Sequence, residues 1–206
     1  MTLTLYTNPM SRGRTARWLL EEAGVEYETV MLDYASTMKQ EPFLLINPMA
    51  KVPAIVHDGQ VVTEGAAICA YVADAFPAAG LAPTAAERPA YYRWLFFAAG
   101  PVEAAVTNRS LNVVPDARQQ AMAGYGSYDR TVDVLERAVS ANAYIAGDRF
   151  TAADVYVGAQ VIWGLQFGSL PDRQAFTDYA GRLTPREAYT RAAALDDAAM
   201  AAAAGA

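Results

Sequence analysis

The N-terminal part of the chain alternates between short strand patterns and helical patterns. Residues 2–6, TLTLY, place two leucines on one face and two threonines and a tyrosine on the other, as in a half-buried strand. From residue 15 the apolar positions recur at helical spacing, and Gly24 stands where such a helix would end. Residues 25–32, VEYETVML, predict a second strand. A strand, a helix and a strand in this order predict a parallel pair.

A hairpin and another helix are expected next. Residues 41–51 have some helical spacing and end at an Asn-Pro pair. The apolar runs before and after Asp58 and Gly59 predict two antiparallel strands joined by a tight turn. A helix should follow and stop at Pro77. The first 76 residues therefore predict the order β-α-β-(α)-β-β-α, a mixed sheet covered by helices.

The remainder of the chain carries no convincing strand pattern. Residues 77–86, PAAGLAPTAA, lack periodicity and predict a linker. Beyond them every periodic stretch has helical spacing, and the Ala-rich end is helix-prone. The predicted organisation is an α/β domain over 1–76, a linker over 77–86 and an all-α helical domain over 87–206.

Composition narrows the class of protein. The 206 residues are 53% apolar and 18% charged, as expected of a globular protein, and the net charge of −6 gives no global attraction to nucleic acid or to an anionic membrane. No apolar stretch approaches the ~18 residues of a membrane span, and the first residues do not resemble a signal peptide. We therefore expect a cytoplasmic protein that binds neither nucleic acid nor membrane.

The single cysteine and the single histidine limit the possible chemistry. Cys69 has no partner for an intrachain disulfide, and one cysteine with one histidine cannot build a zinc cage, so no metal is expected. Cys69 lies on the apolar face of its helix and is predicted to be a core residue. His57 precedes the Asp-Gly turn and is predicted to be exposed and inert.

Three arginines crowd the start of the first helix. Arg12, Arg14 and Arg17 stand at the end that the helix dipole makes unfavourable for cations. One interpretation is a solvated basic face, partly neutralised by Glu21 and Glu22. The other is that at least Arg12 serves an anion held in the preceding loop, such as a thiolate or a carboxylate.

Two further segments have both a structural and a functional interpretation. Val52-Pro53 precedes a strand, either as a trans proline or as a cis bond that turns the backbone of Val52 toward an extended ligand. Thr63 and Glu64 could be the N-cap and an acidic first-turn residue of the next helix. Alternatively, this helix start could bind a carboxylate, with Gly65 allowing close approach.

The helical part carries a capping box and many aromatic residues. In the segment FTAADV, Thr151 and Asp154 can cap each other, with Phe150 and Val155 as a hydrophobic staple, so a central helix should begin here. An aromatic group is expected to be mostly core, with some members lining an apolar pocket. Its members are Tyr91, Tyr92, Trp94, Phe96, Phe97 and Trp163.

Together these segments resemble a known family. LYTNPMSRGR, ARWLLEEAGVEYE, NPMAKVPAI, TEGAAICAYVAD and GDRFTAADV are similar, in this order and over nearly the whole chain, to cytosolic glutathione S-transferases of bacterial type. The resemblance implies a thioredoxin-like N-terminal domain, a helical C-terminal domain, a homodimer and a role in detoxification, with glutathione as co-substrate and no metal.

The resemblance also implies a glutathione site. Val52, before a cis Pro53, would bind the cysteinyl part of glutathione through its backbone. Glu64 and Gly65 would hold the γ-glutamyl carboxylate, and Lys51 would meet the glycyl carboxylate. The family usually has serine after the glutamate, so Gly65 removes one hydroxyl ligand.

Catalysis in this family requires a group that lowers the thiol pKa of bound glutathione. Tyr6, at the end of the first strand, and Ser11, in the loop after it, are both candidates. We favour Ser11 with Arg12, since the loop residue lies nearer to the N-terminus of the helix. A small apolar electrophile is expected beside Ser11, in a pocket lined by Met10, Tyr92, Phe97 and Trp163.

Two alternatives remain open from the sequence. The protein could be a non-catalytic binding or regulatory protein with this fold, which the glycine at position 65 favours. It could also carry out another glutathione-dependent reaction, such as peroxide reduction, isomerisation or dehalogenation.

Overall fold

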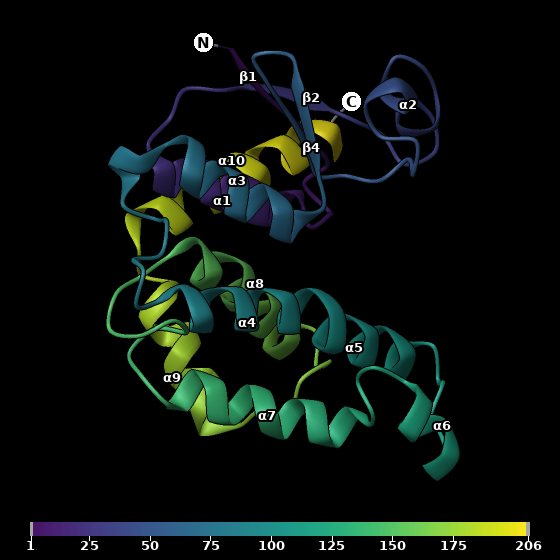
Figure 1. Ribbon diagram of the computed structural model, residues 1–206. Helices are drawn as coiled ribbons and strands as arrows, with labels where there is room; N and C mark the ends of the chain where they lie inside the picture. Colours follow the sequence, from purple (N-terminus) through teal and green to yellow (C-terminus); the bar gives the residue numbers. More distant parts are fainter. Residues whose placement is uncertain (1, 205–206) are drawn as a thin grey trace. The chain divides into compact units, whose positions relative to one another are not determined.

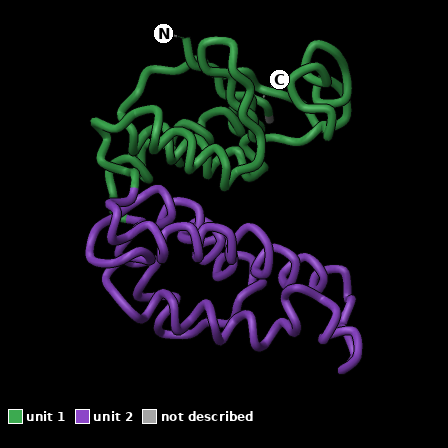
Figure 2. Tube along the Cα trace, viewed as in Figure 1, with its two compact units in different colours: residues 1–82, 185–206 green, residues 83–184 purple. Residues whose placement is uncertain are grey.

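The chain forms two compact units. A computed structural model describes residues 2–204, and Figure 2 colours the two units separately. Unit 1 combines Met1–Ala82 with Pro185–Ala206, and unit 2 is Pro83–Thr184.

A four-stranded mixed sheet is the centre of unit 1. Its spatial order is β2-β1-β3-β4, with β1 parallel to β2, antiparallel to β3, and β3 antiparallel to β4. The predicted parallel first pair and the hairpin at Asp58-Gly59 are both confirmed. The strands are β1 (Leu3–Thr7), β2 (Glu28–Met31), β3 (Ala54–His57) and β4 (Gln60–Thr63).

Three long helices of unit 1 lie together on one side of this sheet in Figure 1. They are α1 (Gly13–Ala23), α3 (Gly65–Ala75) and α10 (Glu187–Ala204). The short segments η1 (Thr37–Lys39), α2 (Phe43–Ile46) and η2 (Pro77–Ala79) complete the unit. Gly24 ends α1 as predicted, with φ of 64° in the left-handed region and its N–H bonded to the carbonyl of Glu21.

The last helix does not lie where the sequence predicts. Residues 87–206 are predicted as one helical domain, whereas α10 packs on α1 within unit 1. The physical reason is a row of ion pairs from α1 to α10 and to Arg186, the residue before α10. These pairs replace the predicted neutralisation of the arginines by Glu21 and Glu22. The pairs are Arg14–Asp197, Arg17–Asp196, Glu21–Arg191 and Glu22–Arg186.

One of these pairs is fully buried. The side chains of Arg17 and Asp196 are 5% and 1% exposed, and Arg17 Nε lies 2.9 Å from Asp196 Oδ1. Arg17 also donates to Tyr27 Oη and Thr29 Oγ1, both at 3.3 Å. Burial raises the pKa of the Asp196 carboxyl, although the guanidinium of Arg17 opposes this effect. A buried charge is tolerated only when it is paired, so this contact ties α10 to α1.

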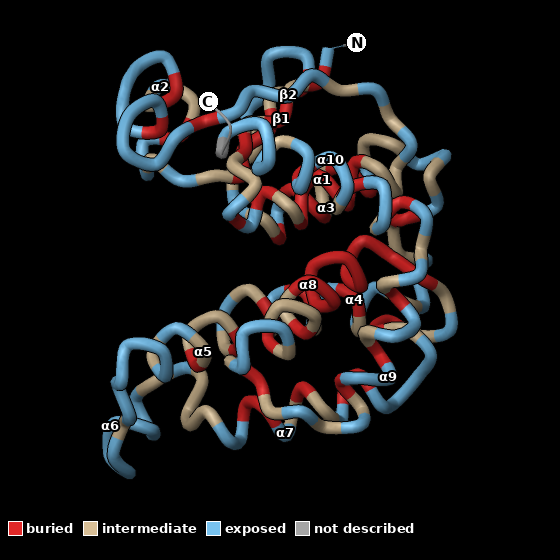
Figure 3. The backbone as a smooth tube through the Cα atoms, turned by 180° about the vertical axis from the view of Figure 1, so that it is seen from behind, coloured by how far each residue is buried: buried red, intermediate tan, exposed pale blue. Residues whose placement is uncertain are grey.

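Unit 2 is helical, as predicted. Its residues form no strand, although Tyr144 and Gly147 make an isolated bridge. Helix α8 is its buried centre, as Figure 3 shows. The helices are α4 (Arg88–Phe97), α5 (Glu103–Ser110), α6 (Ala117–Met122), α7 (Tyr128–Ser140), α8 (Ala152–Gln166) and α9 (Gln174–Leu183), with a π-helical segment, η3 (Ala98–Val102), between α4 and α5.

The predicted capping interaction starts α8. The N–H of Thr151 donates to Asp154 Oδ2 at 2.9 Å, and the hydroxyl of Thr151 donates to the same oxygen at 3.0 Å. The other oxygen, Oδ1, accepts from the N–H of Ile145 at 2.7 Å and from the Tyr179 hydroxyl at 2.8 Å. Asp154 is therefore both a cap and the buried link between α8, α9 and the turn before them. No helix within residues 2–204 is long and apolar enough to cross a bilayer.

The two neighbouring aspartates of α10 provide a test of the buried ion pair. Asp196→Asn leaves the guanidinium of Arg17 buried without a counter-charge, so we expect the free energy of unfolding to fall by ~3 kcal/mol. Asp197→Asn removes a pair in which the aspartate side chain is 68% exposed, and it should lower the free energy by less than ~1 kcal/mol. Urea denaturation measures both, and equal losses would contradict the assignment of α10 to the core of unit 1.

Candidate functional site

The loop between β1 and α1 is organised by Asn8. Its Nδ2 donates to the carbonyl of Leu32 at 2.8 Å, and its Oδ1 accepts from the N–H of Met10 at 2.9 Å. Its own carbonyl accepts from the N–H of Ser11 at 3.1 Å. Asn8 is not among the predicted site residues, although an asparagine that follows a strand is a common signal of a side-chain-stabilised turn.

Ser11 lies at the start of α1 and is only 8% exposed. Its hydroxyl donates to the carbonyl of Asn8 at 2.6 Å and accepts from the N–H of Gly13 at 2.9 Å. Ser11 Oγ therefore satisfies the first free N–H of the helix, in the manner of a capping residue. The positive end of the helix dipole acts on the same oxygen.

Gly13 is required by the close approach of two hydroxyl groups. A Cβ on Gly13 would stand 1.9 Å from Thr7 Oγ1 and 2.9 Å from Ser11 Oγ. Contacts below 3 Å are not tolerated by real Cβ atoms, so a side chain here would displace the end of β1 or the start of α1. The absence of a side chain at this position holds the strand end and the helix start together.

The three arginines at this helix start have different environments. Arg17 is buried against Asp196, as described above, and Arg14 donates to the carbonyl of Pro9 at 2.6 Å and to Asp197 at 2.6 Å. Arg12 is exposed and stands at the N-cap position. The prediction of a solvated basic face is therefore wrong for Arg17. Of the three arginines, Arg12 is the one whose side chain is exposed at the loop.

Tyr6 takes part in packing on the sheet. Its ring lies 5.7 Å from that of Phe43 of α2 and joins a cluster that includes Leu32 and Met38. Alternation along β1 directs Tyr6 and Thr7 to opposite faces. Since Ser11 Oγ shares the neighbourhood of Gly13 with Thr7, the two candidate hydroxyls, Tyr6 and Ser11, are associated with opposite faces of this strand.

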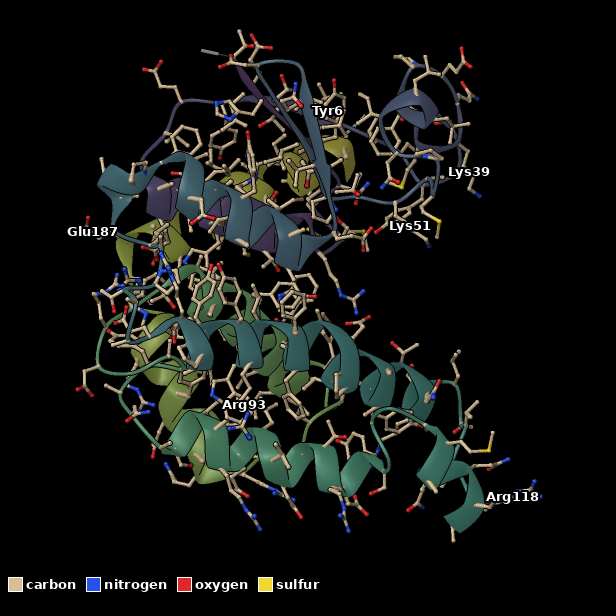
Figure 4. All side chains as sticks on the ribbon, in the orientation of Figure 1. Tyr6, Lys39, Lys51, Arg93, Arg118 and Glu187 are labelled. Carbon is tan, nitrogen blue, oxygen red and sulfur yellow. The ribbon has the colours of Figure 1, made fainter. Side chains whose placement is uncertain are left out.

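The segment before β3 has the cis proline that the functional interpretation of Val52-Pro53 requires. The Val52-Pro53 peptide bond is cis. Val52 lies two residues before β3 begins, so its backbone polar groups are outside the strand ladder. Asn47, which is 4% exposed, holds the segment by donating to the carbonyl of Lys51 at 2.7 Å. The side chain of Lys51 is exposed at the same edge of unit 1 as Lys39 (Figure 4).

The start of α3 corrects one detail of the sequence analysis. The N-cap is Glu64 rather than Thr63, and the helix begins at Gly65. Glu64 has φ of 66°, which is unfavourable for a residue with a side chain, and its carboxylate makes no capping bond. Such strained residues cluster at ligand sites. The exposed carboxylate of Glu64 therefore does not serve the helix that it precedes.

The four residues expected to line an electrophile pocket are distributed over both units. Met10, in unit 1, is 75% exposed. Within unit 2, Tyr92 packs on Tyr91, Phe97 on Trp94 and Trp163 on Phe167, each edge to face. The pocket of Met10, Tyr92, Phe97 and Trp163 stays a prediction.

The single histidine and the single cysteine are both buried. His57 is 7% exposed, its Nδ1 is hydrogen-bonded to Tyr71 Oη at 2.9 Å, and its ring packs on Phe76. The prediction of an exposed histidine is therefore wrong, because the turn at Asp58-Gly59 exposes its own residues but not the strand residue before them. Cys69 is 0% exposed and burial raises its thiol pKa, which confirms a core residue.

The sheet order, the helices on its face and the cis proline before β3 define unit 1 as a thioredoxin-like domain. Residues 1–74 match the family model described as "Glutathione S-transferase, N-terminal domain". Glutathione S-transferase 3 of Zea mays is 32% identical over 165 residues, covering 74% of this chain and 73% of the maize protein. Glutathione S-transferase GST-4.5 of Xanthomonas campestris is 28% identical over 183 residues, covering 81% and 84%.

Solved structures agree with this similarity over both units. A sphingomonad glutathione S-transferase, determined in complex with glutathione, has a TM-score of 0.76 and 28% identity, covering 94% of this chain and 98% of its own. The chain belongs to the glutathione S-transferase family and is a glutathione transferase enzyme.

Two glycines test the close packing around Ser11. Gly13→Ala should lower the free energy of unfolding by ~1–3 kcal/mol, because the new methyl group overlaps Thr7 Oγ1. Gly181→Ala in α9 is the matched control, since nothing lies within 4 Å of its Cβ position, and the better helix former should stabilise by up to ~1 kcal/mol. Chemical denaturation should show changes of opposite sign in the free energy of unfolding. Stabilisation by both substitutions would contradict the packing described for Gly13.

Proposed function

We propose that this enzyme binds glutathione on unit 1 and activates its thiol for attack on small apolar electrophiles. The observation that carries the proposal is Ser11 Oγ, held at the N-terminus of α1 by the N–H of Gly13. The complex of the sphingomonad relative with glutathione supports the choice of ligand.

The segments around the loop supply groups for the rest of glutathione. The backbone of Val52, before cis-Pro53, pairs with the cysteinyl part as an added strand would. The N–H groups at the start of α3, near Glu64 and Gly65, receive the γ-glutamyl carboxylate. Lys51 meets the glycyl carboxylate as an exposed cation.

Ser11 activates the thiol by stabilising its anion. The hydroxyl turns from the carbonyl of Asn8 to the sulfur, while Oγ continues to accept from the N–H of Gly13. The carbonyl of Asn8 keeps its bond from the N–H of Ser11 at 3.1 Å, so the rotation leaves no orphaned acceptor. Arg12 and the helix dipole add positive potential. Lowering the thiol pKa by about two units requires ~2.7 kcal/mol, which a charge-assisted hydrogen bond and a helix end can supply.

The reaction then needs no further group from the protein. The thiol proton passes to solvent, and the sulfur electron pair forms the new bond to an electrophilic carbon of the second substrate. The bond from that carbon to its leaving group breaks, and the leaving group departs with the electron pair of that bond. The apolar pocket of Met10, Tyr92, Phe97 and Trp163 is proposed to bind that substrate. A homodimer, a cytoplasmic location and a role in detoxification are proposed on the family resemblance.

A non-catalytic glutathione-binding protein is the second candidate. Gly65 favours it, because a serine at this place would offer one more hydrogen bond to the γ-glutamyl carboxylate. Peroxide reduction, isomerisation and dehalogenation would use the same activated thiolate, and a screen of electrophiles and peroxides separates them from conjugation.

Substitution of the two candidate hydroxyls tests the activation step. Ser11→Ala should raise the thiol pKa of bound glutathione by about two units and lower kcat/KM about 100-fold near neutral pH. Tyr6→Phe should leave the thiol pKa nearly unchanged and kcat/KM within a few-fold of the wild-type value, because Tyr6 packs against α2. Thiolate absorbance as a function of pH measures the pKa.

If Tyr6→Phe is inactive and Ser11→Ala is active, Tyr6 and not Ser11 activates the thiol of glutathione. Calorimetric titration with glutathione is the control for binding. No binding at millimolar ligand would reject the proposed function altogether, and binding without a lowered thiol pKa would favour the non-catalytic candidate.

Charge neutralisation at Lys51 tests the position of the glycyl carboxylate. Lys51→Ala should weaken glutathione binding about tenfold, since it removes a charge-assisted contact. Arg118→Ala, on α6 of unit 2, removes an exposed cation of the same charge and should leave the dissociation constant unchanged (Figure 4). Calorimetry at two salt concentrations measures both, and an equal response would show a general effect of net charge instead of a site.

A further inference from the structure

The last residue of β1 carries a buried hydroxyl group with no partner. Thr7 is 0% exposed, and within residues 2–204 its Oγ1 makes no hydrogen bond. A buried donor without a partner costs ~1–3 kcal/mol relative to a satisfied one. Valine has nearly the same shape and would avoid this cost, so packing alone does not explain a threonine here.

The position of this hydroxyl points to Ser11. Thr7 Oγ1 and Ser11 Oγ both lie within 3 Å of the place where a Cβ on Gly13 would stand, at 1.9 and 2.9 Å. The two oxygens therefore flank the same space, which the missing side chain of Gly13 leaves open. Hydroxyl hydrogens rotate freely, so Thr7 can direct its proton toward this space, where Ser11 Oγ is a possible acceptor.

Ser11 Oγ makes two other hydrogen bonds in the structure. Its proton is directed to the carbonyl of Asn8, and the N–H of Gly13 uses one of its lone pairs. When the proton turns toward a ligand, the remaining lone pair turns as well. Among the groups described around Gly13, the hydroxyl of Thr7 is a donor without a hydrogen-bond partner that could donate to this lone pair.

We infer that Thr7 is a positioning residue for Ser11. On binding of glutathione, Thr7 Oγ1 donates to Ser11 Oγ while Ser11 donates to the sulfur, so that Ser11 accepts two hydrogen bonds and gives one. Hydrogen bonds in a chain polarise one another, and Ser11 becomes a stronger donor to the thiolate. The step only rearranges hydrogen bonds and leaves every covalent bond in place. The inference rests on the proposed activation of glutathione by Ser11.

The test compares Thr7→Val with Thr7→Ser in the full-length enzyme. Thr7→Val should be at least as stable to urea as the wild type, because it removes an unsatisfied hydroxyl. It should nevertheless raise the thiol pKa of bound glutathione by about one unit. At pH values below the wild-type thiol pKa, it should lower kcat/KM about tenfold and leave the dissociation constant of glutathione unchanged. Thr7→Ser keeps the hydroxyl and should retain the wild-type pKa. Thr7→Ala gives the same readout if the valine variant does not fold.

A double variant separates this inference from the proposed function. In Ser11→Ala the loss of Thr7 should have no further effect on the thiol pKa, since Thr7 acts through Ser11. If the thiol pKa of bound glutathione is at the wild-type value in Thr7→Val and raised in Ser11→Ala, the inference is overturned and the proposed function stays intact. A normal pKa in Ser11→Ala would overturn the role of Ser11, and with it that of Thr7. Additive effects in the double variant would also reject action through Ser11.

Discussion

The buried ion pair between Arg17 and Asp196 is the contact on which unit 1 depends most. It joins residues 179 positions apart, and neither side chain has access to water that could replace the other. An unpaired charge buried in this place would cost several kcal/mol, so α10 can cover α1 only with both partners of the pair present. Because α1 begins at the loop of Ser11, the same pair that secures α10 also holds the helix whose N-terminus lies at the proposed site.

The proposed glutathione site is built mainly from backbone groups fixed by small polar side chains. Asn8 holds the loop of Ser11, and Asn47 holds the segment of Val52, each through bonds to main-chain atoms. Such sites present N–H groups and a hydroxyl to a ligand without burying a permanent charge, which keeps the cost of desolvation low. The strained backbone of Glu64 fits this arrangement, since its carboxylate is left outside the helix cap.

Much of the fold could be predicted because each element carries a local signal. Alternation in β1, the Asp-Gly turn and the capping box at Thr151 act over a few residues and are legible without tertiary contacts. The place of α10 could not be predicted in this way, since its pattern shows that it is helical but not what it packs against. For the same reason neither interpretation of the arginines, a solvated basic face or an anion held in the loop, includes the pairing of Arg14 and Arg17 with the aspartates of α10. The roles of Asn8 and Gly13 could not be predicted from the sequence, because they depend on distances between atoms that lie apart along the chain.

The assignment of α10 to unit 1 has a consequence for synthesis. Unit 2 is one continuous segment, Pro83–Thr184, inserted into a unit made of two. A ribosome completes every residue of unit 2 before it adds the helix that neutralises Arg17. During that interval the sheet and α1 wait with an unpaired guanidinium and an uncovered helix face, so the thioredoxin-like unit, although first in the sequence, is the last to be completed.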